Sequence, residues 1–125
     1  MHPKSQPSMY KNFELTSLAA FFDDDQLVVH EYLEVVVDDW FGLKQELEIA
    51  IENKNSKEYR SIVNRMLAPM RLLKMAELQN LLNNGNARID LSDAPENQIY
   101  FRALLDKVAD FLEELTESLP AIKSA

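Results

Sequence analysis

A chain of 125 residues, 46% of them hydrophobic, is long enough to form one domain that buries roughly two-thirds of its unfolded surface. Its net charge of −8 argues against nucleic acid and an anionic membrane surface as partners. The absence of cysteine excludes disulfides and thiolate metal sites, and without a secretory signal or an apolar run of about 18–20 residues we expect a cytoplasmic protein.

Helix breakers are rare, with two glycines and five prolines, and long stretches follow a 3.6-residue apolar period, which predicts an all-α fold. Residues 1–12 are polar and interrupted by proline, which is typical of a flexible tail. A short helix is predicted over Phe13–Phe22, followed by a turn at Asp23–Asp25. Asp24 or Asp25 can cap the next helix.

The second predicted helix covers Gln26–Glu52 and ends in a turn at residues 53–56, where Asn55 or Ser56 can cap its successor. Its apolar stripe comprises Val29, Leu33, Val36, Trp40, Leu43, Leu47, Ala50 and Ile51. A third helix is predicted from about Lys57, with a kink at Pro69, to a left-handed cap around Gly85.

The chain then predicts a loop over Arg88–Asp93 and a last helix, with Asp93 as cap, Pro95 in the first turn and Pro120 as its end. The inward stripe of this helix comprises Ile99, Leu104, Leu105, Val108, Phe111, Leu112, Leu115 and Leu119. Short connections favour antiparallel neighbours. We therefore predict an antiparallel up-down-up-down four-helix bundle with a short N-terminal helix over residues 13–120, and a C-terminal tail over 121–125.

The segment Tyr59–Lys74, YRSIVNRMLAPMRLLK, has an apolar frame formed by Val63, Met66 and Leu73. It resembles the signature helix of histidine phosphotransfer (HPt) domains, four-helix modules that relay phosphoryl groups between receiver domains. The apolar and turn spacing of that family can be followed without a gap from Phe13 to Lys74. The resemblance implies an HPt-like bundle and a signalling role in a two-component phosphorelay.

Three positions depart from the HPt pattern. Asn64 stands where the family has its phosphorylated His, Leu67 where it has Lys, and Ala68 where it has Gly. An imidazole nitrogen is nucleophilic near neutral pH, whereas a carboxamide nitrogen is not, and Leu67 cannot balance phosphate charge. The resemblance therefore implies a pseudo-phosphotransfer module, without enzymatic activity or cofactor, that binds a receiver domain without carrying phosphate.

Positive charge is concentrated in the same segment. Residues 57–74 carry five basic side chains against one acidic, a local charge of +4 in a chain of −8. Helical spacing places Arg60, Asn64, Leu67, Ala68 and Arg71 along one face, and Lys74 extends its basic rim. The resemblance implies that these six residues dock on the carboxylate-rich pocket of a receiver domain. The alternative is an ordinary solvated helix surface.

Other sites are weaker candidates. His30 is expected to be a solvated residue on the second helix, and an active phosphotransfer protein that uses His30 is the least favoured function. Asp23–Asp25 lacks the glycine and terminal glutamate of a calcium loop, so no metal site is expected. We expect a monomer, and the main alternative function is a helical structural or oligomerisation module unrelated to phosphorelay.

Overall fold

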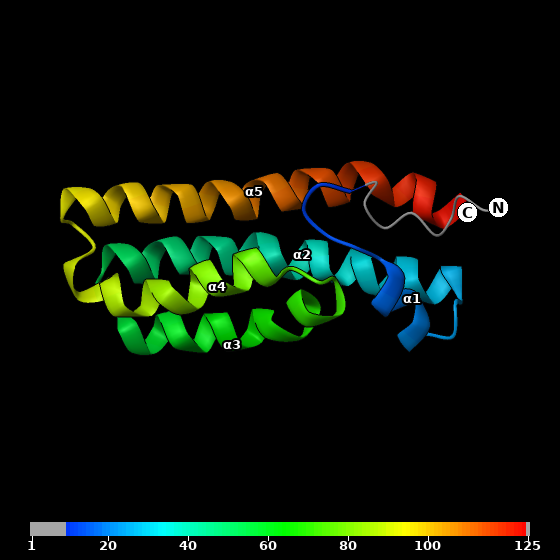
Figure 1. Ribbon diagram of the computed structural model, residues 1–125, viewed down its shortest axis with the longest axis horizontal. Coiled ribbons are helices and arrows are strands. Elements are labelled where there is room, and N and C mark those ends of the chain that lie inside the picture. Colours follow the sequence, from blue (N-terminus) through cyan, green and yellow to red (C-terminus); the bar gives the residue numbers. More distant parts are fainter. Residues whose placement is uncertain (1–9, 125) are drawn as a thin grey trace.

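The computed structural model describes residues 10–124, and this part of the chain is helical, with no strands (Figure 1). Its elements are α1 (Thr16–Phe21), α2 (Gln26–Glu52), α3 (Ser56–Leu72), α4 (Ala76–Gly85), the 3₁₀ helix η3 (Asn86–Leu91) and α5 (Pro95–Ser124). The predicted all-α class is confirmed. None of the helices within residues 10–124 combines the length and the apolarity needed to cross a bilayer.

The four longer helices form a bundle. In Figure 1, α2 and α4 run in one direction and α3 and α5 in the opposite direction. Each of them packs against the next along the chain, and α5 returns to pack along α2, so that α3 and α5 lie on a diagonal. Helix α1 covers one end of the bundle beside α2.

Helix α2 has the predicted bounds. The Asp25 carboxylate accepts a hydrogen bond from the Val28 N–H at 3.3 Å, which satisfies one of the free amides of the first turn. All eight residues of its predicted stripe are buried, and Leu33, Trp40 and Leu47 are almost completely enclosed. Asn55 caps α3 in the same way, accepting from the Glu58 N–H at 3.0 Å.

The predicted third helix is two helices. Helix α3 ends at Leu72, three residues after Pro69, and the chain reverses through a Schellman turn into α4. The Met75 N–H donates to the Met70 carbonyl at 2.9 Å, and Lys74 adopts a left-handed conformation with φ of 57°. Burial of Met70 and Met75 on either side of the turn stabilises the reversal, so the prediction of a single helix that continues past Pro69 to Gly85 is wrong.

Gly85 has a different role from the predicted left-handed cap. No glycine has positive φ, and α4 passes directly into η3 at this point. A methyl group on Gly85 would meet the hydroxyl of Tyr59, which donates to the Leu82 carbonyl at 2.6 Å, and would lie 3.2 Å from the Phe101 ring. The glycine is therefore needed for close packing.

The predicted loop at Arg88–Asp93 lies mostly within η3, and Ile89 is fully buried there. Asp93 lies two residues before α5, and its carboxylate accepts a hydrogen bond from Lys54 Nζ at 3.1 Å. Ile99 is 72% exposed, so its place in the predicted core is wrong. Helix α5 does not end at Pro120 but continues to Ser124, with Ile122 buried against the bundle.

Residues 10–14, referred to below as the strap, pack against α5 at Asp110, Phe111 and Glu114 before α1 begins. Phe13 is buried edge-on against Phe111, and the Glu14 N–H donates to the Leu73 carbonyl at 2.9 Å. The prediction of a flexible tail is therefore wrong for residues 10–12, which are anchored to α5. Residues 1–9 of that predicted tail lie outside the described part of the chain. Because the strap lies in this position, α1 begins at Thr16 rather than at Phe13.

Candidate functional site

Helix α3 brings five of the six predicted docking residues to one side. Its core residues form a stripe on the opposite side, made of Tyr59, Ile62, Val63, Met66 and Met70. Of the docking residues, Arg60, Asn64, Ala68 and Arg71 are exposed, and Leu67 is half-buried. We call this surface the α3 face. It has a small, mostly apolar centre between two arginines.

Lys74 does not belong to the α3 face. It lies beyond the end of α3, in the left-handed position of the turn before α4. There it lines a hollow of about 430 Å³ together with the strap and the first turn of α4. Only Arg71 therefore provides positive charge at that end of the face.

The arginines of the α3 face remain available to a partner. Within residues 10–124, neither Arg60 nor Arg71 forms an ion pair with an acidic side chain. Arg65, in contrast, lies on the side of α3 that faces α2 and contacts the carboxylates of Glu46 at 2.9 Å and Glu58 at 3.8 Å. Its charge is balanced within the bundle, so within residues 10–124 the unpaired positive charge of α3 comes from Arg60 and Arg71 on the α3 face and from Lys57 in the first turn.

Asn64 lies in the middle of this face. Its side chain is exposed and forms no hydrogen bond with any other side chain in the described part of the chain. The carboxamide can donate and accept hydrogen bonds, but its nitrogen lone pair is delocalised into the carbonyl group. Asn64 can therefore contact a partner, whereas it cannot serve as a phosphoryl acceptor.

His30 is not the solvated residue that was predicted. Its side chain is only 9% exposed, and its Nδ1 lies 3.5 Å from Glu34 Oε1, one turn further along α2. The sequence carried a signal of this burial, because His30 lies at helical spacing from the buried Leu33, Val37 and Trp40. A buried ring has limited access to a phosphoryl donor on another protein.

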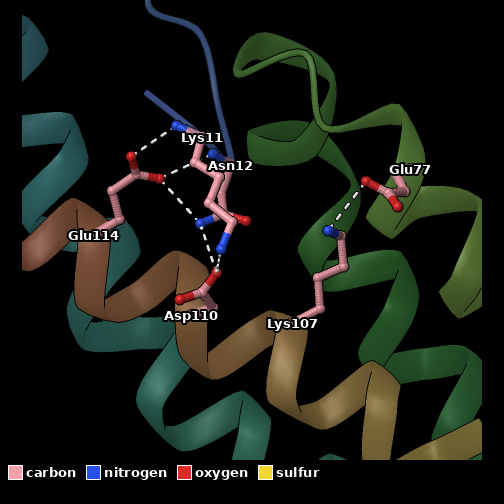
Figure 2. Close-up of polar contacts among 6 residues, drawn as sticks. All are labelled: Lys11, Asn12, Glu77, Lys107, Asp110 and Glu114. Atoms are coloured by element: carbon pink, nitrogen blue, oxygen red, sulfur yellow. Dashed lines mark hydrogen bonds and ion pairs between the residues drawn. The ribbon is translucent and has the colours of Figure 1, made fainter. Parts of the chain in front are cut away.

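A second polar cluster joins the strap to α5 (Figure 2). The Asn12 side-chain amide donates to Asp110 at 3.1 Å and to Glu114 at 3.0 Å, while Lys11 lies 3.3 Å from Asp110. The hydrogen bond from Asn12, followed by that from Lys11, lowers the pKa of the Asp110 carboxyl. These partners are 98 to 103 positions apart in sequence, and no local pattern predicted them.

Other kinds of site find little support. Within residues 10–124, no group of three or more His, Asp or Glu side chains is arranged to hold a metal ion. In the Asp23–Asp25 run, Asp25 caps α2 and Asp23 occupies the left-handed position of the turn after α1.

No protein-family model matches the chain, and neither a curated protein nor a solved structure matches it.

Proposed function

We propose that the chain is an HPt-like phosphorelay signalling module that binds a receiver domain through the α3 face without accepting phosphate. The observation that carries this proposal is the composition of that face. Asn64, Leu67 and Ala68 lie between Arg60 and Arg71, whose charges no acidic side chain within residues 10–124 neutralises. Such a surface is complementary to an acidic pocket with an apolar margin.

The fold supports the same proposal. The HPt resemblance implies a helical bundle that presents its signature helix to solvent, and α3 is a regular helix within an all-α bundle. Pro69 lies in the last turn of α3, and the helix continues beyond it to Leu72, so Arg71 is still part of the helix. A rigid helix positions side chains for docking more reproducibly than a loop does.

The binding proposal is tested by charge reversal on the α3 face. Arg71→Glu should lower the association rate constant for a receiver domain by about tenfold at low salt and make it less salt-sensitive, because arginine steers the encounter. Arg102→Glu is the matched control, since Arg102 is exposed on α5, diagonal to α3, and the change in charge is the same. Stopped-flow kinetics at two ionic strengths measure the association rate constant and its salt dependence for both variants. Equal affinities for the unaltered chain and Arg71→Glu would rule out this docking face.

The absence of phosphate transfer is tested separately. A receiver domain phosphorylated on its carboxylate should transfer no label to the unaltered chain, because Asn64 offers no nucleophile. In the triple variant Asn64→His/Leu67→Lys/Ala68→Gly, the imidazole should displace the receiver carboxylate at phosphorus and retain the label as acid-labile, base-stable phosphate. Label on the unaltered chain would contradict the proposal. If the Asn64→Ala variant still acquired the phosphate label and the His30→Gln variant did not, phosphate transfer would be assigned to His30.

A further inference from the structure

A long surface groove lies between α2 and α5, on the side of these helices that α3 and α4 do not cover. It consists of two adjoining hollows of about 470 Å³ and 630 Å³, which share Lys44, Glu48 and Ala109. We call it the α2–α5 groove. On α2 it extends from Phe41 to Glu52, a distance of about 16 Å at the usual helical rise. This length accommodates roughly three turns of another helix.

The floor of the groove is apolar. Helix α5 contributes Leu105, Ala109, Leu112 and Thr116, which recur at helical spacing along one strip. Ala109 is exposed at the middle of the strip, where its small side chain leaves room for a close approach. Phe41 forms part of the opposite wall and is 53% exposed, although it is a large aromatic residue. Covering these side chains would remove apolar surface from water.

The rim of the groove is strongly acidic. Six acidic and two basic side chains line it: Glu48, Glu52, Asp93, Asp106, Glu113 and Glu117, with Lys44 and Arg102. Glu48 is paired with Lys44 at 3.7 Å and Asp93 with Lys54 at 3.1 Å. The remaining four carboxylates have no ion-pair partner within residues 10–124.

We propose that the α2–α5 groove binds an amphipathic helix of a protein partner, with apolar residues on one face and lysine or arginine along both flanks. The apolar face would pack on Ala109 and Phe41, and the basic flanks would pair with Glu52, Asp106, Glu113 and Glu117. A second copy of this chain is a poorer occupant, because two molecules that each carry a charge of −8 repel one another. The groove is separate from the α3 face, and its occupant does not depend on receiver binding.

The test uses a synthetic peptide of about 14 residues, long enough for roughly four helical turns, with leucines along one face and lysines on both flanks. A second peptide carries glutamate in place of each lysine. Added to the labelled full chain, the cationic peptide should shift the amide NMR signals of the groove residues in a saturable manner, and the anionic peptide should not. Equal binding of both peptides, or no shift at millimolar concentration, would overturn the proposal.

Two variants with the same change in charge locate the site. Glu113→Lys/Glu117→Lys should weaken binding of the cationic peptide by at least about tenfold, since it replaces two attractions with repulsions. Asp39→Lys/Asp90→Lys, at exposed positions outside the groove, should weaken it by less than about threefold because salt screens distant charges. Equal losses would overturn the assignment to the groove. If the signals of the groove residues shift with the concentration of the chain itself, in the absence of peptide, the proposed occupant is wrong and a second copy of the chain binds the groove instead.

Discussion

Tyr59 connects two helices through one hydroxyl group. Its ring is buried against Phe101, and its hydroxyl donates to the Leu82 carbonyl at 2.6 Å. Burial, the main cause, raises the pKa of Tyr59 far above that of a free tyrosine, so the hydroxyl remains a donor at all physiological pH values. Because the ring must come so close to α4, only a residue without a side chain fits at Gly85.

The same substitution at the two glycines should therefore have opposite effects. Gly85→Ala should lower the free energy of unfolding by about 1–3 kcal/mol, because its methyl group displaces the Tyr59 hydroxyl. Gly42→Ala should raise it by about 0.5–1 kcal/mol, since no atom lies within 4 Å of the added methyl and alanine favours the helix. Urea denaturation measures both. If Gly85→Ala leaves the free energy of unfolding unchanged, the packing of Gly85 against the Tyr59 hydroxyl is not tight.

Asp110 provides a second test at the scale of a residue. Its pKa is lowered first by the hydrogen bond from Asn12 and then by that from Lys11 (Figure 2). A lowered folded-state pKa stabilises the fold above the unfolded value of 3.8, and this contribution is lost as the pH falls through the folded value. Asn12→Ala and Lys11→Ala should each raise the pKa of Asp110, as measured by carboxyl-carbon NMR titration, because each variant removes a contact that lowers it. An Asp110 pKa that stays unchanged in both variants would contradict the anchoring of the strap.

At the scale of the element, three helices end in the same way without glycine. Asp23, Lys54 and Lys74 occupy the left-handed position of Schellman turns after α1, α2 and α3, with φ values of 55°, 54° and 57°. A residue with a side chain costs roughly 1 kcal/mol in this conformation. At the α3–α4 turn, burial of Met70, Leu73 and Met75 offsets that cost.

Lys74→Gly should stabilise the chain by about 0.5–1 kcal/mol, because it relieves the left-handed backbone of the α3–α4 turn. It should not weaken receiver binding, since Lys74 lies beyond the α3 face. Thermal denaturation and the binding kinetics described above measure these two effects. A loss of affinity as large as that of Arg71→Glu would place Lys74 back in the docking surface.

These elements also show what could be predicted from the sequence. Helix α2 was predicted to the residue, because an aspartate cap precedes an uninterrupted apolar stripe. The turn between α3 and α4 was missed because Lys74 replaces the glycine that usually marks it, and Gly85 was misread because its role depends on Tyr59 from another helix. The strap was missed for the same reason, since its partners are about one hundred positions away in sequence. The α3 face could be predicted because helical spacing alone defines it.

At the scale of the whole molecule, charge is separated between two surfaces. The α3 face carries Arg60 and Arg71, whereas the α2–α5 groove carries four carboxylates without ion-pair partners in the described part of the chain. Because α3 and α5 lie on a diagonal of the bundle, the core separates these surfaces. Charges on opposite sides are screened from one another at physiological ionic strength, where the Debye length is about 8 Å.

We therefore expect the two surfaces to act independently. Arg71→Glu should leave binding of the cationic peptide within about twofold of the original affinity, and Glu113→Lys/Glu117→Lys should do the same for receiver binding at physiological salt. Isothermal titration calorimetry with each partner, alone and with the other present, measures this. A large mutual effect would mean that the two sites are coupled through the bundle.

The most direct test of the central claim is a two-dimensional NMR titration of the labelled chain with receiver domains from the same organism, with and without a phosphoryl mimic. We predict saturable shifts that cluster at Arg60, Asn64, Leu67, Ala68 and Arg71, and few shifts on α5. The comparison with the mimic shows whether binding responds to phosphorylation of the receiver. If no receiver shifts the α3 face at high micromolar concentration, the proposed function is wrong, and a structural module becomes the better interpretation.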